Sequence, residues 1–143
     1  MNANLTPYLM LDGNAREAAV FYAEVFDAEI ESMELLKDWP QEFDGDIPEG
    51  SEDSVVHAYV RIGPLGLMLA DIFPGQPYEP GSLITIMVDV KETDEAKTLF
   101  ERLSDGGDVI MPISETSFSP AYAQVKDKYG IEWQILTDSS DMN

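Results

Sequence analysis

With 143 residues, 44 % of them hydrophobic, the sequence is long enough for one domain with a real core, and a second domain is not expected. Its 28 acidic residues against 8 lysines and arginines give a net charge of −20, which repels phosphate backbones and anionic lipids and so disfavours nucleic-acid and membrane partners. The chain contains no cysteine, which excludes disulfides, thiolate nucleophiles and cysteine-type zinc sites.

The first predicted elements are a short strand, Pro7 to Leu11, and an amphipathic helix after it. Asn14 can cap this helix, and Glu17, three residues on, can be the returning partner of a capping box. An apolar stripe at i, i+3, i+4 and i+7 follows, formed by Ala18, Phe21, Tyr22 and Val25. The stripe predicts that one side of the helix packs against other structure.

Two further strands are predicted in the first half, and an acidic loop precedes them. The strands are Val55 to Ile62 and Leu67 to Ala70, joined by a turn at residues 64–66. The loop, Lys37 to Asp53, is rich in proline, glycine and acids, and we expect a solvated segment, with a lid as the alternative. Its Asp-Gly-Asp sequence at 44–46 lacks the spacing of an EF-hand calcium loop.

The second half repeats the same series of elements. A strand, Leu83 to Val90, leads into a helix that Thr93 can cap. Strands at Tyr122 to Val125 and Ile131 to Leu136 come after the helix, separated by a turn that ends at Gly130. The second helix has an apolar stripe of its own, formed by Ala96, Leu99, Phe100 and Leu103.

The two halves are related by a regular spacing. Each member of the second helix stripe lies 78 residues after its counterpart in the first, whereas Gly66 and Gly130 are only 64 residues apart. The first half therefore has 14 extra residues (78 minus 64), which the acidic loop accounts for. The sequence predicts an α+β fold of two tandem βαβββ modules, at about 1–75 and 80–143.

Three segments, "PYLMLDGNAREAAVFYAEVF", "VVHAYVRIG…LMLAD" and "DKYGIEWQI", resemble the PhnB-like branch of the vicinal oxygen chelate superfamily, which also holds glyoxalase I and the bleomycin-resistance proteins. The resemblance runs over nearly the whole chain. It implies that residues 1–143 form one domain, in which a U-shaped mixed sheet has the helices on its convex side and a ligand cavity inside. It also implies a homodimer.

The resemblance further implies where a metal would be held. Metal-dependent members take their ligands from the first and last strands of each module, at positions that correspond here to Pro7, Ala70, Thr85 and Gln134. A catalytic metal needs about three ligands from histidine or carboxylate groups, which this set does not supply. We therefore predict no metal and no other cofactor, the alternative being one divalent metal in a shifted site.

Strand parity predicts which side chains face the cavity. Ile131, Trp133 and Ile135 form an apolar row suited to the helix layer, so their neighbours Glu132 and Gln134 must face the other way. The same rule over all strands predicts a cavity lined by Leu9, Leu11, His57, Tyr59, Met68, Thr85, Met87, Tyr122, Gln124, Glu132 and Gln134. Such a lining is typical of a small-molecule pocket, but a filled interior or a dimer surface has the same composition.

His57 is the only histidine in the chain. Histidine is the side-chain type that ordinarily changes charge near neutral pH. His57 is either a structural strand residue or a catalytic one, acting as a general base or ligand-orienting donor with Tyr59 or Glu132 close enough to select its tautomer.

These observations favour a metal-independent protein that binds a small neutral or cationic organic ligand. The alternatives are a metal-dependent lyase, isomerase or oxygenase whose shifted site includes His57 and Glu132, and a structural module whose own large side chains fill its interior. A methyltransferase is not supported, because the sequence has no glycine-rich strand-to-helix turn of the dinucleotide-binding type. The first residues carry no basic region and the apolar runs are too short to span a bilayer, so we expect a cytoplasmic location.

Overall fold

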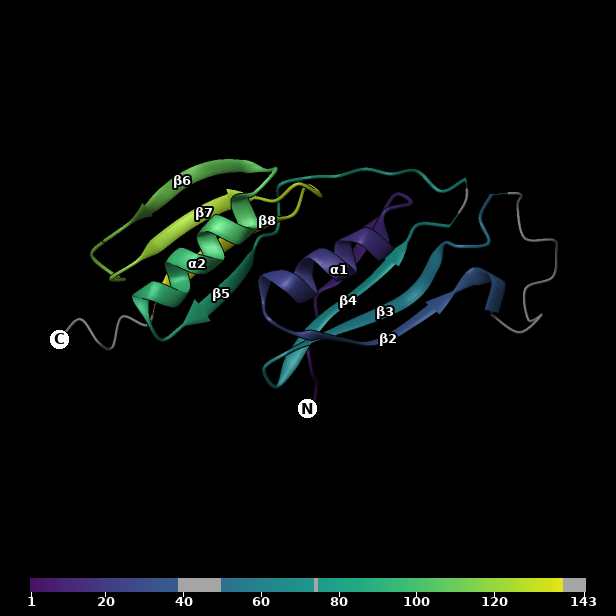
Figure 1. The fold of residues 1–143 in the computed structure, drawn as a ribbon, viewed down its shortest axis with the longest axis horizontal. Helices are drawn as coiled ribbons and strands as arrows, with labels where there is room; N and C mark the ends of the chain where they lie inside the picture. Colours follow the sequence, from purple (N-terminus) through teal and green to yellow (C-terminus); the bar gives the residue numbers. More distant parts are fainter. Residues whose placement is uncertain (39–49, 74, 138–143) are drawn as a thin grey trace. The chain divides into compact units, whose positions relative to one another are not determined.

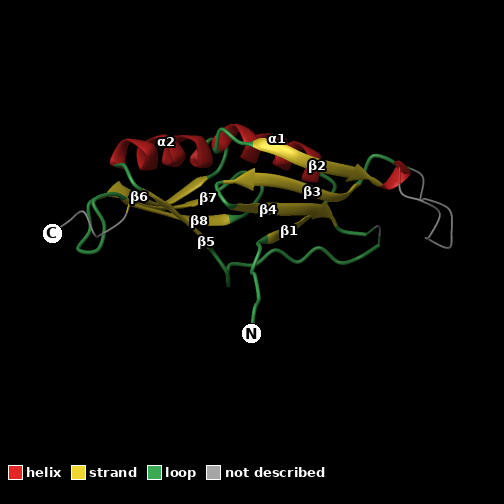
Figure 2. Ribbon diagram, turned by 90° about the horizontal axis from the view of Figure 1, so that it is seen from below, coloured by secondary structure: helices red, strands yellow, loops and turns green. Residues whose placement is uncertain are grey.

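The computed structural model describes residues 1–38, 50–73 and 75–137, and the chain divides into two units, Met1–Glu79 and Pro80–Asn143. Each unit has one α-helix lying against one face of a four-stranded mixed sheet (Figure 1 and Figure 2). In the described part of the chain, no helix has the length and apolar character needed to cross a membrane.

The first unit has its strands in the order β1-β4-β3-β2, with β1 parallel to β4 and the other pairs antiparallel. Its elements are β1 (Tyr8–Leu11), α1 (Ala15–Val25), β2 (Glu29–Leu35), the short 3-10 helix η1 (Leu36–Asp38), β3 (Val55–Ile62) and β4 (Leu65–Asp71). The sequence located β1, β3 and β4 to within a few residues. It left the position of β2 open.

The second unit has the same topology, with the order β5-β8-β7-β6 and one parallel pair, β5 with β8. Its elements are β5 (Ile86–Val90), α2 (Thr93–Ser104), β6 (Asp108–Ser114), β7 (Tyr122–Lys126) and β8 (Glu132–Thr137). The predicted α+β fold with a βαβββ repeat is confirmed, and β2 and β6 are the strands that complete each sheet.

The core of each unit lies between its helix and its sheet. All four residues of the predicted α1 stripe are buried, and so are three of the four in α2, the exception being the half-buried Phe100. The sheets meet the helices with alternating strand residues, as period-two strands must. These include Ala58, Val60, Leu67 and Leu69 in the first unit and Ala123, Val125, Trp133 and Ile135 in the second, all buried.

The position of the first helix cap is predicted correctly, since Asn14 is the N-cap residue of α1, but its side chain makes no capping hydrogen bond, and the second cap is displaced by one residue. The first backbone amide of α1, at Ala15, donates to the Asp71 carboxylate Oδ1 at 2.9 Å, and Asn14 Oδ1 is buried with no hydrogen-bond partner among the described residues. The cap of α2 is Glu92, one residue before Thr93, and its amide donates to the side chain of Glu95 at 3.3 Å. A carboxylate from the end of β4 thus replaces the local cap that the sequence predicts for α1.

The ends of the acidic loop are held together. Lys37 and Asp53 form an ion pair of 3.1 Å, and the amides of Leu36 and Lys37 donate to the carbonyls of Ser54 and Glu52. The pairing continues the β2–β3 hairpin past the ends of its strands. Residues 39–49 lie outside the described residues, and so do the predictions made about them, the solvated loop or lid and the Asp-Gly-Asp segment.

Candidate functional site

Each sheet has one face against its helix and one face turned away from it, which we call the helix-free face. Cross-strand register decides which side chains lie on it. In the first unit Tyr8 is opposite Met68, and Met68 is opposite Tyr59, whereas the neighbouring row of Leu9, Leu69 and Ala58 is buried against the helix side. The helix-free face of the first sheet therefore carries Tyr8, Met10, His57, Tyr59, Arg61 and Met68.

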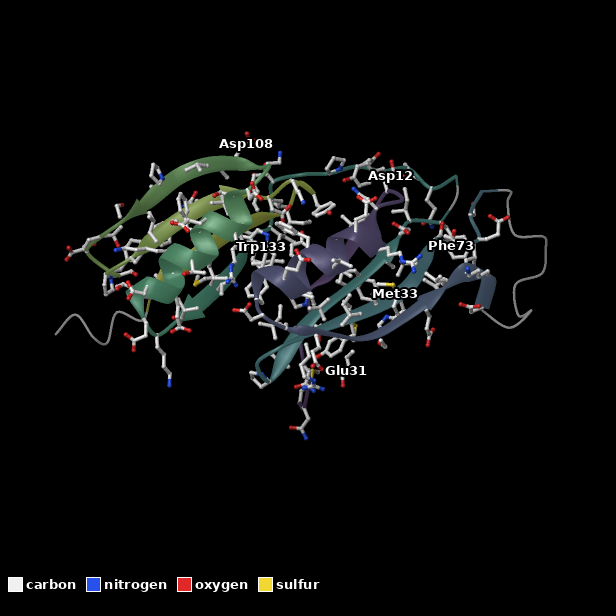
Figure 3. All side chains as sticks on the ribbon, viewed as in Figure 1. Asp12, Glu31, Met33, Phe73, Asp108 and Trp133 are labelled. Carbon is white, nitrogen blue, oxygen red and sulfur yellow. The ribbon has the colours of Figure 1, made fainter. Side chains whose placement is uncertain are left out.

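Two polar contacts occupy the helix-free face of the first sheet. The Tyr8 hydroxyl lies 3.4 Å from His57 Nδ1, with the ring centroids 6.1 Å apart. Arg61 Nε donates to Glu31 at 3.0 Å, and its guanidinium lies 5.7 Å from the centre of the Tyr59 ring. The hydrogen bond and negative charge of Glu31, on β2 and labelled in Figure 3, raise the pKa of Arg61. Tyr8, absent from the predicted lining, is thus the polar partner of His57.

The orientation predicted for Leu9 and Leu11 is wrong. Leu9 is 7 % exposed and Leu11 1 %, on the helix side, whereas Tyr8 and Met10 on the other side are 44 % and 48 % exposed. The strand and the helix that follows it are spaced differently in the two units. In the first unit the helix-facing Leu11 lies 7 residues before Ala18, but in the second the helix-facing Val90 lies 6 residues before Ala96.

A change of one residue in the connection reverses strand parity. Three residues, 12–14, join β1 to α1, and two residues, 91 and 92, join β5 to α2. In β1 it is therefore Tyr8 and Met10 that face away from the helix, and Leu9 and Leu11 that face it.

The helix-free face of the second sheet carries a connected chain of uncharged polar groups. Gln124 Nε2 donates to the Tyr122 hydroxyl at 2.8 Å, and that hydroxyl donates to Gln134 Oε1 at 2.5 Å. Gln134 Nε2 in turn donates to the Thr85 hydroxyl at 2.8 Å. We call these four residues the amide chain. The sequence predicted all four for the cavity, but it did not predict that they bond to one another.

Apolar side chains border the amide chain. One row of cross-strand partners crosses the whole sheet, in the order Met87, Gln134, Gln124 and Met111. A methionine therefore stands at each edge of the sheet in this row. Phe118 contacts the buried Tyr122 ring edge-on, with centroids 4.9 Å apart. The remaining predicted residue, Glu132, lies in the next row, opposite Lys126.

Two buried groups hold the strands that carry the amide chain. The carboxylate of Asp127, 3 % exposed, accepts from the amides of Tyr129 and Ile131 at 2.9 and 3.1 Å and from the indole N–H of Trp133 at 2.8 Å. Ser119, fully buried, bonds to both Ala121 and Thr137. Sequence reasoning missed both groups. The Asp-x-x-Gly turn at 127–130 was the available signal for the first.

The residues at the implied metal positions do not fit a catalytic metal. Ala70 has no donor atom, and the Gln134 amide already bonds to Tyr122 and Thr85. In neither unit do the described residues bring together three or more histidine, aspartate or glutamate side chains able to hold a metal. His57 lies on the first sheet and Glu132 on the second, and the shifted site that combines them stays a prediction.

A family model described as 3-demethylubiquinone-9 3-methyltransferase matches residues 3–136. The chain belongs to this family. The Escherichia coli K12 protein YjdN is 29 % identical over 92 % of each chain. A Pseudomonas aeruginosa protein, PA1353, is 30 % identical with a TM-score of 0.85, covering 96 % of this chain and 98 % of its own.

Other family and fold relatives agree. A Bacillus cereus PhnB protein, whose description names the same methyltransferase, is 27 % identical to this chain. The two structures match with a TM-score of 0.75, over 94 % of this chain and 99 % of the Bacillus cereus protein. A Frankia glyoxylase/bleomycin resistance protein/dioxygenase domain, 16 % identical, has a TM-score of 0.66 over 96 % of this chain and 98 % of its own. The chain therefore shares its fold with a glyoxylase/bleomycin resistance protein/dioxygenase domain.

Proposed function

We propose that this family member is a metal-independent small-molecule-binding protein of the glyoxalase/bleomycin-resistance type, which acts as a cytoplasmic homodimer. Its ligand is a neutral or cationic organic compound held on the helix-free sheet faces. The observation that carries the proposal is the bonding of Gln134, whose amide is shared between Tyr122 and Thr85 at a position where metal-dependent relatives would need a free ligand.

The composition of the two helix-free faces supports an organic ligand. Eight of the eleven predicted lining residues stand at strand positions whose register turns them to these faces, and Thr85, just before β5, bonds to Gln134. Together they combine rings and methionines with a few hydrogen-bonding groups, as small-molecule sites do. The binding role of each remains part of the proposal.

The charge distribution supports a neutral or cationic ligand. Arg61, the cation on the helix-free face of the first sheet, is paired with Glu31. The net charge of −20 repels anions at long range. Both the pairing of Arg61 with Glu31 and the negative net charge would disfavour binding of an anionic substrate such as a phosphonate.

Methyl transfer is not part of the proposal, although the family description names it. The connections that lead from β1 to α1 and from β5 to α2 contain one glycine, Gly13, in five residues, and no glycine-rich cofactor turn. The fold is a βαβββ repeat, not a doubly wound sheet.

Native mass spectrometry of freshly purified protein tests the proposal, because one spectrum reports subunit number, metal and any retained organic molecule. We expect a metal-free dimer, with or without an organic adduct. A stoichiometric divalent metal would contradict metal independence and favour the lyase, isomerase or oxygenase alternative.

The role of His57 is tested separately. His57→Ala should weaken the thermal stabilisation that basic aromatic compounds confer, since its ring lies beside Tyr8 on the proposed binding face. The matched control is Lys97→Ala on the exposed side of α2. If His57→Ala left both binding and any turnover unchanged, the histidine would be a structural residue only.

A further inference from the structure

We propose that the amide chain recognises an uncharged ligand group that carries a hydrogen-bond acceptor and a donor side by side, such as a carboxamide. The inference rests on the proposed binding function and narrows it, because it assigns the ligand class at the second unit. It excludes cations and anions as the group bound there.

The first step is the direction of the hydrogen bonds. Gln124 uses one N–H for Tyr122, and Tyr122 uses its single O–H for Gln134. Gln134 then uses one N–H for Thr85. Among the described residues no bond is made by Gln124 Oε1 or by the second N–H of Gln134. The amide chain therefore has one carbonyl oxygen, on Gln124, and one N–H, on Gln134, left to bind a ligand.

The second step is the position of these two groups. Gln124 and Gln134 are direct cross-strand partners of an antiparallel pair. Side chains at such positions start roughly 5 Å apart and point to the same face. The free carbonyl and the free N–H are thus presented next to each other, which matches the paired N–H and C=O of a carboxamide.

The third step is the absence of charge in the chain. Threonine, tyrosine and glutamine are all uncharged near neutral pH. The acidic side chains in the two adjacent rows of this face are Glu132, opposite Lys126, and Asp89, opposite Leu136. A charged group bound to Gln124 and Gln134 would lose water and gain only uncharged hydrogen-bond partners from the amide chain itself.

The fourth step is preorganisation. The Tyr122 ring is 7 % exposed and contacts Phe118, so its hydroxyl is held in place between the two amides. Met87 and Met111 stand at either end of the row, 57 % and 41 % exposed. Methionine side chains are polarisable and adapt to flat apolar bodies. A ring attached to the carboxamide would pack on them.

Three probes of the same shape test the inference: benzamide, which is neutral, benzamidine, which is cationic, and benzoate, which is anionic. Binding is measured by NMR titration of the full chain, following the side-chain NH₂ signals of Gln124 and Gln134. Fragments of this size bind with dissociation constants of about 1 mM or weaker. We expect benzamide to shift both signals and the two ionic probes to bind at least about tenfold more weakly.

Gln134→Glu gives the second arm, since it replaces the free N–H by an acceptor and adds a negative charge. It should weaken benzamide binding about tenfold and reverse the preference in favour of benzamidine. Gln76→Glu is the matched control. It adds the same charge in the first unit and keeps the side-chain oxygen that accepts from Phe73, so the preference for benzamide should remain.

The outcomes separate this inference from the proposed function. If benzamidine or benzoate shifts the two signals more strongly than benzamide, the ligand class is wrong while a binding function stands. If no probe shifts them, the amide chain is not a carboxamide site, and native mass spectrometry alone decides the proposed function. If Gln76→Glu changes the preference as much as Gln134→Glu, the effect is long-range charge, and the inference is also overturned.

Discussion

Replacing Asp127 by alanine should unfold the second unit far more easily, because one buried carboxylate satisfies at least three donors. It accepts two backbone amides in the β7–β8 turn and the indole N–H of Trp133, which is only 1 % exposed. A hydrogen bond to a charged group contributes about 1.5–3 kcal/mol. The two turn amides can regain water, but the indole N–H cannot, so we expect a loss of about 3–5 kcal/mol.

The assay is urea unfolding followed by the fluorescence of Trp133. Trp39, which lies outside the described residues, is changed to phenylalanine in every protein so that Trp133 is the only reporter. For a slope of about 1 kcal/mol per molar urea, a loss of 3 kcal/mol lowers the midpoint by about 3 M. The urea midpoint of Asp127→Asn should lie between those of the unsubstituted protein and Asp127→Ala. The asparagine keeps one acceptor oxygen, but its side-chain amide turns an N–H towards the indole N–H.

Asp105→Ala is the control, an exposed aspartate in the same unit, just after α2. Surface changes of this kind usually alter stability by less than about 0.5 kcal/mol. If Asp127→Ala unfolded at the same urea concentration as Asp105→Ala, the carboxylate would not hold the turn, and our account of what fixes β8 would be refuted.

Three further substitutions test other parts of the fold. Asp71→Ala should free two backbone amides and cost about 1–3 kcal/mol, seen as faster hydrogen exchange at the start of α1. Ser119→Ala should cost about 1–3 kcal/mol in urea unfolding, whereas the exposed Ser117→Ala should be nearly neutral. Gly66→Ala would drive its new methyl group into the Val60 carbonyl oxygen, so the first unit should melt several degrees lower.

The sequence by itself determined the features that depend on local periodicity. The helix stripes, the alternation in β3, β4, β7 and β8 and the repeat of the modules all follow from side chains whose positions recur every 3.6 or 2 residues. The same alternation placed Gln124 and Gln134 on one face, which is why all four residues of the amide chain could be predicted.

The tertiary structure decided what depends on distant partners. The cap of α1 comes from Asp71, 56 residues away from Ala15, and no local pattern announces it. The orientation of β1 depends on a connection one residue longer than that of β5, and one residue is enough to exchange the two faces of a strand. The bonds among Thr85, Tyr122 and Gln134 likewise exist only because three strands lie in register, with a buried ring fixing the hydroxyl between two amides.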